Sequence, residues 1–200
     1  MSTSAADTGA AASPAQAPEE TGQDETTKGL PPKKKPCWPD DPNYPDGYTE
    51  IDLPSERLLR AYFDTQILEA SDEPQPRIIH ADDYFKVRFR LELKGELWYC
   101  ICGDWWFDLG FSPTGAGKGF DLSNVLGREK FYYRNWRGCD TRCIELVIEV
   151  PPGTIPVEYC GTVYKCAAKV QLYCCGKSAA VVGFDDMGTF QFYKADIDED

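Results

Sequence analysis

The chain has 200 residues, of which 42% are hydrophobic and 13% aromatic, and its formal net charge is −12 at pH 7. This is long enough for one ordinary domain plus a tail, and apolar enough for a packed core. The acidic balance argues against a nucleic-acid partner, because the phosphate backbone requires clustered Lys and Arg. No stretch reaches the roughly 18 apolar residues of a membrane span, so no membrane partner is expected.

Residues 1–45 are predicted to be a disordered arm. Residues 1–30 consist mainly of small residues, prolines and acids, which bury too little apolar surface to offset the entropy of ordering. A stiff Pro/Lys linker follows at 31–36. The first residues have neither the basic start nor the leucine-rich segment of a secretory signal. The predicted localisation is therefore cytoplasmic, with leaderless export left open.

Residues 46–195 are predicted to form the folded domain. Its first long segment, 58–70, has apolar residues at helical spacing but also alternates as a strand does, and we favour the strand because the rest reads as β. Residues 77–80 are predicted to be a short edge strand. The clearest strand covers 84–94, where one face of the alternation is apolar. Its inward residues are Phe85, Val87, Phe89, Leu91 and Leu93.

A hairpin is expected after this strand. Lys94-Gly95-Glu96 interrupts the alternation, and glycine commonly supplies the positive φ of a hairpin turn. Residues 97–102 then read as the returning strand, with Gly103-Asp104 as a bulge or tight bend before 105–111 continues. Two such strands need a second sheet to bury their apolar faces.

The rest of the domain also reads as short strands bounded by Gly, Pro and Asp turns, and no reliable helix is predicted. The expected strands are 128–136, 143–150, 162–174, 179–184 and 189–193. A turn is expected at 185–188, and 196–200 reads as a solvated acidic tail. Seven to nine short strands predict an all-β fold, an antiparallel two-sheet β-sandwich of immunoglobulin-like architecture, with a Greek-key barrel as the alternative.

Catalytic residues are not assigned, and the protein is expected not to be an enzyme. His80 is the only histidine and lies beside Asp82-Asp83. It is predicted to be a surface residue, because the sequence contains no nucleophile motif for which it could act as the base. The glycine-rich loop 114–119 lacks the P-loop glycine at Ser112 and its hydroxyl at Gly119, so it is predicted to be a surface loop. Asp82-Asp83 and Asp185-Asp186 could bind calcium, but turns favour aspartate and the turn interpretation is preferred.

Nine cysteines leave three interpretations open. Cys100 and Cys102 share a strand face, and Cys139 with Cys143 spans a turn, so the two pairs could form a zinc or redox site if they met in space. Their spacing departs from the C-x-x-C of zinc knuckles, and no metal or cofactor is assigned.

Disulfides are the second interpretation of the cysteines. The candidate pairs are Cys139 with Cys143, or Cys160 with Cys166, and either would require an oxidising compartment. The third interpretation is burial as small apolar residues, which suits Cys166 and Cys174 on the inward face of the strand at 162–174.

Three tryptophans are the candidate binding residues: Trp105, Trp106 and Trp136. Because Trp105 and Trp106 point to opposite faces of one strand, one is expected to pack between the sheets and the other to face solvent, another segment or a partner. The sequence thus predicts a non-enzymatic interaction or structural module with an unidentified protein partner. The alternatives are a carbohydrate-binding sandwich that uses these tryptophans and a cysteine-based metal or redox protein.

Overall fold

The structure is a computed structural model that describes residues 37–38, 59–134, 142–158 and 160–194. These residues form two β-sheets with three short helical turns, so the all-β fold class is confirmed. The predicted arm at 1–45, except Cys37 and Trp38, and the predicted tail at 196–200 lie outside the described residues. No helix in the described part of the chain is long and apolar enough to cross a membrane.

The first sheet has three antiparallel strands in the order β1-β3-β7. They are β1 (Arg60–Glu69), β3 (Phe85–Lys94) and β7 (Cys143–Val150). Each alternates between buried and more exposed residues, as a strand with one face on a core does. The predicted strands at 58–70, 84–94 and 143–150 are therefore confirmed.

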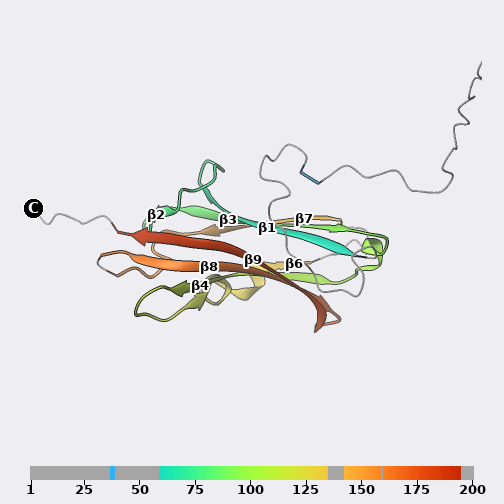
Figure 1. The fold of residues 1–200 in the computed structure, drawn as a ribbon. Helices are drawn as coiled ribbons and strands as arrows, with labels where there is room; N and C mark the ends of the chain where they lie inside the picture. The colour runs from blue at the N-terminus through green and yellow to red at the C-terminus, as the bar shows by residue number, and fades with distance from the viewer. Residues whose placement is uncertain (1–36, 39–58, 135–141, 159, 195–200) are drawn as a thin grey trace, which may run out of the picture. The chain divides into compact units, whose positions relative to one another are not determined.

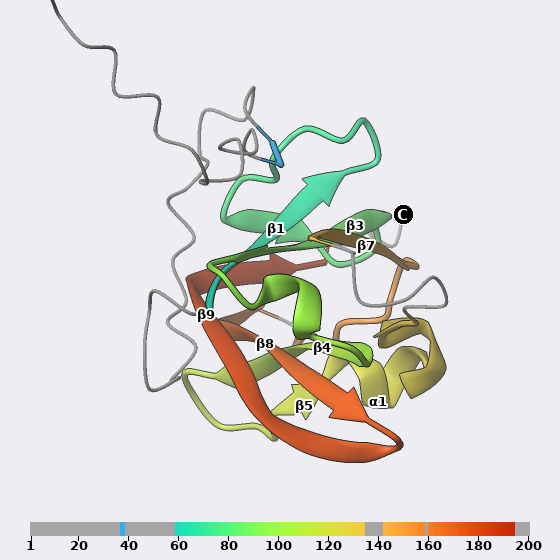
Figure 2. The same cartoon turned by 90° about the vertical axis from the view of Figure 1, so that its right-hand side faces the viewer.

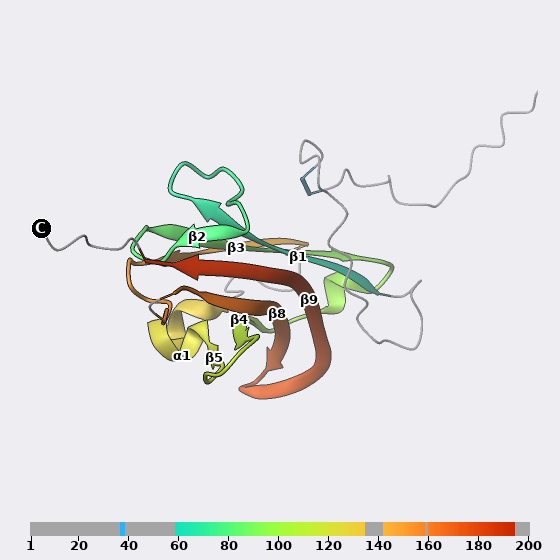
Figure 3. The ribbon, with the colours of Figure 1, turned by 60° about the vertical axis from the view of Figure 1, so that its left-hand side comes forward.

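The second sheet has six strands, with the main order β2-β9-β8-β4-β5 and β6 paired separately with β4. Its strands are β2 (Ile78–His80), β4 (Asp104–Pro113), β5 (Phe120–Asp121), β6 (Tyr132–Tyr133), β8 (Thr162–Cys174) and β9 (Lys177–Tyr193). The pairs are antiparallel except β2–β9, which is parallel. Figures 1 and 3 show that the end of the long β8–β9 hairpin curves away from the first sheet.

Aromatic rings from both sheets share one core. Phe63 of β1 lies 6.0 Å from Phe107 of β4, and Phe89 of β3 lies 5.5 Å from the same ring, centroid to centroid. Phe85 of β3 meets Phe192 of β9 at 6.1 Å. The first sheet thus faces the second across these contacts, as Figure 2 shows from the end of the strands. Burial of such large rings is the main stabilisation available to the fold.

The predicted hairpin after 84–94 is wrong. β3 ends at Lys94, Trp98–Cys100 forms a 3-10 turn (η1), and the chain then enters the second sheet as β4. β4 pairs with β8 rather than with β3. Local alternation does not reveal which sheet a strand joins, and this connection crosses from one sheet to the other.

The predicted strand at 128–136 is found only in small part, and its last two residues lie outside the described ranges. Arg128–Phe131 forms a 3-10 turn (η2), and only Tyr132–Tyr133 pairs with β4. A short helix, α1 (Leu122–Leu126), precedes it, although no helix was predicted. The Asp108 carboxylate of β4 accepts hydrogen bonds from the Ser123 backbone N–H at 3.0 Å and from the Ser123 hydroxyl at 2.7 Å. The helix start is therefore held by a strand residue distant in sequence, which no local capping pattern reveals.

The predicted turn at 185–188 is also wrong, because β9 runs without a break from Lys177 to Tyr193. Cys166 lies opposite Gly188 and Ala167 opposite Asp186, which leaves Met187 as the extra residue of a β-bulge. Gly188 has φ +77°, a conformation that favours glycine. Asp185 and Asp186 therefore project from a bulged strand instead of a turn.

Candidate functional site

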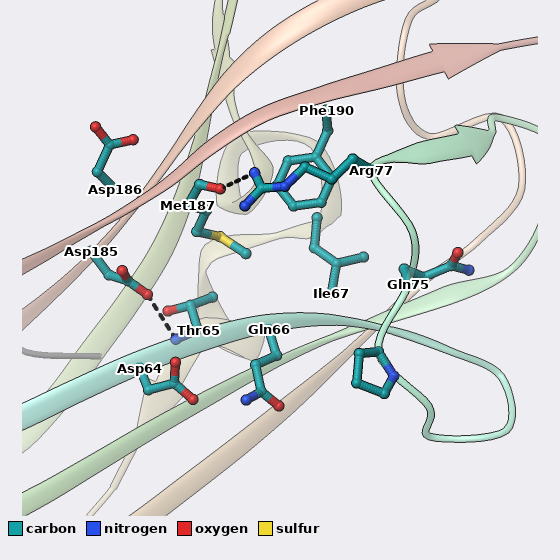
Figure 4. A pocket seen from close by; sticks show the side chains of 11 residues that line it. Asp64, Thr65, Gln66, Ile67, Gln75, Arg77, Asp185, Asp186, Met187 and Phe190 are labelled. Carbon is teal, nitrogen blue, oxygen red and sulfur yellow. Dashed lines mark hydrogen bonds between the residues drawn. The ribbon is translucent and has the colours of Figure 1, made fainter. Parts of the chain in front are cut away.

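A cleft of about 320 Å³ opens between β1 of the first sheet and β9 of the second. It is bounded by residues 64–67 of β1, the segment 74–77 that leads into β2, and residues 185–190 around the β9 bulge. We call it the mouth cleft, and Figure 4 shows its side chains. β1 and β9 do not pair with each other, so the cleft lies between the edges of the two sheets.

At both edges of the mouth cleft, backbone N–H and carbonyl groups form hydrogen bonds with side chains or with a loop. The Thr65 N–H of β1 donates to Asp185 Oδ2 at 2.8 Å, and the Ile67 carbonyl accepts from the Gln75 N–H at 2.9 Å. Across the cleft, Arg77 Nη1 donates to the Met187 carbonyl at 2.6 Å. Exposed strand edges otherwise invite unspecific pairing, and such caps protect them.

One end of the mouth cleft is acidic. Burial raises the pKa of Asp185 to about 6, and the nearby carboxylates of Asp64 and Asp186 raise it further while the Thr65 N–H opposes them. Asp186 differs, because the Gly188 N–H at 3.0 Å and Lys165 at 3.2 Å lower its pKa. Two adjacent carboxylates thus have opposite pKa shifts.

The other end is basic and its floor is apolar. The Arg77 guanidinium lies 5.0 Å from the centroid of the Phe190 ring, and Figure 4 shows it at the opposite end from Asp185. Ile67, Met187 and Phe190 supply buried apolar surface below. The Thr65 hydroxyl, on a residue 6% exposed, is buried beside Asp185, and its oxygen accepts no hydrogen bond. The cleft therefore combines a polar, charge-separated rim with an apolar base, as binding sites commonly do.

Of the three surroundings expected for the second tryptophan, Trp106 has one, because it packs against another segment of the chain. Trp105 is 1% exposed and Trp106 is 6% exposed. Trp106 lies on the outer face of the second sheet, but Lys169 at 4.4 Å and Arg128 at 4.8 Å from its ring centroid cover it. Neither ring is an open stacking platform, and Trp136 lies outside the described residues.

The cysteines form a pattern that sequence spacing did not predict. Cys143 forms a disulfide with Cys37, 106 residues away, with Cα atoms 5.8 Å apart. Cys143 is therefore not bonded to Cys139, and as a disulfide sulfur it is not a thiolate ligand. Cys102 is also disulfide-bonded. Trp38, next to Cys37, lies 5.1 Å from the Arg90 guanidinium, so contacts with the first sheet begin before the predicted boundary at residue 46.

The remaining cysteines correct two further expectations. Cys160 and Cys166 are free thiols, so their predicted disulfide is wrong. Cys166 is buried, as predicted, and burial raises its pKa to about 12, which makes it unreactive. Cys174 is exposed rather than inward, and Cys100 is a free, exposed thiol. In the described ranges, no group of three or more His, Cys, Asp or Glu residues is placed to hold a metal ion.

His80 and the glycine-rich loop lie outside the mouth cleft. The His80 ring packs edge-on to Tyr193 at 5.0 Å, and its Nδ1 lies 3.7 Å from Asp83. Residues 114–119 are exposed in the connection from β4 to β5, so the predicted surface loop is confirmed. The sequence did single out Asp185-Asp186, but nothing local connected it to Thr65 or Arg77.

Comparisons with known proteins give little guidance. No protein-family model matches the sequence, and no curated protein matches it. Among solved structures, the chain is similar to one described as the crystal structure of the C-terminal domain of wzt. That match has 10% sequence identity and a TM-score of 0.41, and it covers 68% of this chain and 74% of the other. A similarity this low does not indicate a shared function.

Proposed function

We propose that this protein is a non-enzymatic interaction module that binds a protein partner at the mouth cleft. The observation that carries the proposal is the cleft itself, an open space of about 320 Å³ between two capped strand edges. Because backbone groups at both edges are already hydrogen-bonded, a partner would bind through side chains that enter the cleft and not by adding a strand. The scaffold of the proposal is the predicted immunoglobulin-like β-sandwich, supported by the aromatic core that both sheets share.

The charges and the floor of the cleft also suit a protein ligand. Asp185 and Arg77 lie at opposite ends, so a bound segment would find a carboxylate and a guanidinium at separate positions. The buried Phe190 ring and the side chains of Ile67 and Met187 would accept an apolar side chain. The other two predicted functions are not taken further, because Trp105 and Trp106 are buried and Cys143 is disulfide-bonded.

Site-specific photo-crosslinking in an extract of the source cells tests the proposal. A benzophenone amino acid at Gln75, on the rim of the cleft, should give discrete adducts with a protein that excess unmodified chain competes away. The matched control is the same amino acid at Val147, which is 43% exposed and lies on β7, a strand that contributes no lining residue. Identical adducts at both positions, or none at Gln75, would refute the proposal.

A further inference from the structure

The acidic end of the mouth cleft contains a carboxylate without a neighbouring cation. No ion pair within 4.0 Å among the described residues involves Asp185, whereas its neighbour Asp186 has Lys165. The nearby carboxylates of Asp64 and Asp186 oppose its negative charge, and so does burial. A positive charge that entered the cleft would relieve both effects, because it would pair with a carboxylate that is poorly solvated.

Thr65 gives an independent indication of a ligand at the same position. Its hydroxyl is buried beside the Asp185 carboxylate and its oxygen accepts no hydrogen bond, although most buried polar groups are fully hydrogen-bonded. Figure 4 shows it beside the Asp185 carboxylate, on the wall of the cleft. An ammonium or guanidinium that reached Asp185 would bring several N–H donors, one of which could donate to Thr65 Oγ1.

The rest of the cleft limits which cation would fit. Arg77 occupies the far end, where it is held by the Met187 carbonyl and the Phe190 ring. Between the two ends the floor is apolar, which suits the methylene stem of a long basic side chain better than a hydrated inorganic ion.

We propose that the acidic end of the mouth cleft binds a lysine or arginine side chain of the partner, with Asp185 as the ion-pair acceptor and Thr65 Oγ1 as a second acceptor. The identity of the partner as a protein rests on the proposed function. The chemistry of recognition rests on Asp185, Thr65 and their neighbours. The basic side chain would enter above the apolar floor, with its charged group at the carboxylate.

Nuclear magnetic resonance of the ¹⁵N-labelled full chain tests this inference. The probe is the peptide acetyl-Gly-Gly-Lys-Gly-Gly-amide, and the control is the same peptide with norleucine in place of lysine. The lysine peptide should cause saturable shifts of the amide signals of Thr65, Gln66 and Asp185 at millimolar concentration, and the norleucine peptide should not. No saturable shift, or equal shifts with both peptides, would overturn the inference.

Two variants separate recognition from structure. Asp185→Asn keeps an oxygen acceptor for the Thr65 N–H but removes the charge, and it should abolish the lysine-dependent shifts while the remaining spectrum is unchanged. Thr65→Val keeps the volume and removes the hydroxyl, and it should weaken binding several-fold. Undiminished binding by a folded Asp185→Asn variant would overturn the inference, and if that variant does not fold, undiminished binding by Thr65→Val would do so.

The two proposals fail separately. Adducts at Gln75 without binding of the lysine peptide would overturn the basic side chain as ligand and leave the interaction function standing. Binding of the lysine peptide without adducts at Gln75 would support the recognition chemistry and refute the protein partner.

Discussion

Replacing Asp185 with asparagine is expected to stabilise the protein at neutral pH and to have little effect at acidic pH. The pKa of Asp185 is raised from 3.8 to about 6, first by burial, so the folded state favours the protonated form. That stabilisation is fully present below pH 3.8, the ordinary value, and is lost as the pH rises through about 6. Asparagine remains neutral throughout and avoids the loss, while its side-chain oxygen still accepts from the Thr65 N–H.

The size of this effect follows from the shift in pKa. Each unit corresponds to about 1.4 kcal/mol, so a rise of about two units sets an upper limit of roughly 3 kcal/mol. Because Asp185 lines an open cleft, solvent screens its charge, and we expect about 1–2 kcal/mol in the free energy of unfolding. Urea unfolding followed by tryptophan fluorescence, at about pH 3.5 and about pH 7.5, measures the difference.

A destabilised variant at neutral pH, or the same change at both pH values, would refute this reasoning. The first result would mean that the hydrogen bond from Thr65 to the charged carboxylate outweighs the cost of burying the charge, and the second that the charge of Asp185 does not determine the effect. Asp186→Asn is the matched control, because the Gly188 N–H and Lys165 lower the pKa of Asp186. Its stability should change in the opposite direction, with a loss at neutral pH that fades as the pH falls.

Three further predictions concern the core, the disulfide and the helix start. Phe107→Ala should lower the free energy of unfolding by about 3–5 kcal/mol in urea titrations, because the ring is fully buried between the sheets. Cys37→Ser should cost about 2–4 kcal/mol under oxidising conditions and nothing after reduction, whereas Cys160→Ser, at an exposed free thiol, should cost nothing in either. Asp108→Ala should cost about 1–3 kcal/mol and speed amide exchange at Ser123, whose buried N–H would lose its acceptor.

The sequence predicted those strands that have one face on the core and one in solvent. β3, β7 and β8 lie close to their predicted positions, because alternate burial imposes a period of two on the residues. β4 did not show this pattern, since residues 105–109 are all buried in succession. Its outer face is covered by residues such as Arg128 and Tyr132, more than twenty positions later. The residue pattern of β4 therefore does not reveal which later segment covers its outer face.

The β9 bulge shows that the same residues can form either a turn or a β-bulge. Asp-Asp-Met-Gly is typical of a turn, but here Gly188 supplies the positive φ of a bulge and the strand continues. The deciding factor is pairing with β8, which extends on both sides of the bulge. Turn composition alone cannot distinguish these outcomes.

The mouth cleft could not be derived from the sequence because the contacts that join β9 to β1 and to Arg77 are distant along the chain. Thr65 and Asp185 are 120 positions apart, and Arg77 and Met187 are 110 apart. The sequence did mark Asp185-Asp186 as noteworthy. The significance of this pair comes from the strand edge opposite, and that edge is placed by the fold as a whole.

The parallel pairing of β2 with β9 also sets the order in which the chain can fold. Residues 78–80 pair with residues 191–193, so β2 has no place in its sheet until the last described strand has been synthesised. Contacts of such wide sequence separation slow folding, because the connecting chain must lose its freedom before they form. On the ribosome, β2 therefore waits for β9 to emerge, whereas β1 can pair with β3 earlier, and the mouth cleft, which needs residues 185–190 of β9, is among the last parts of the molecule to assemble.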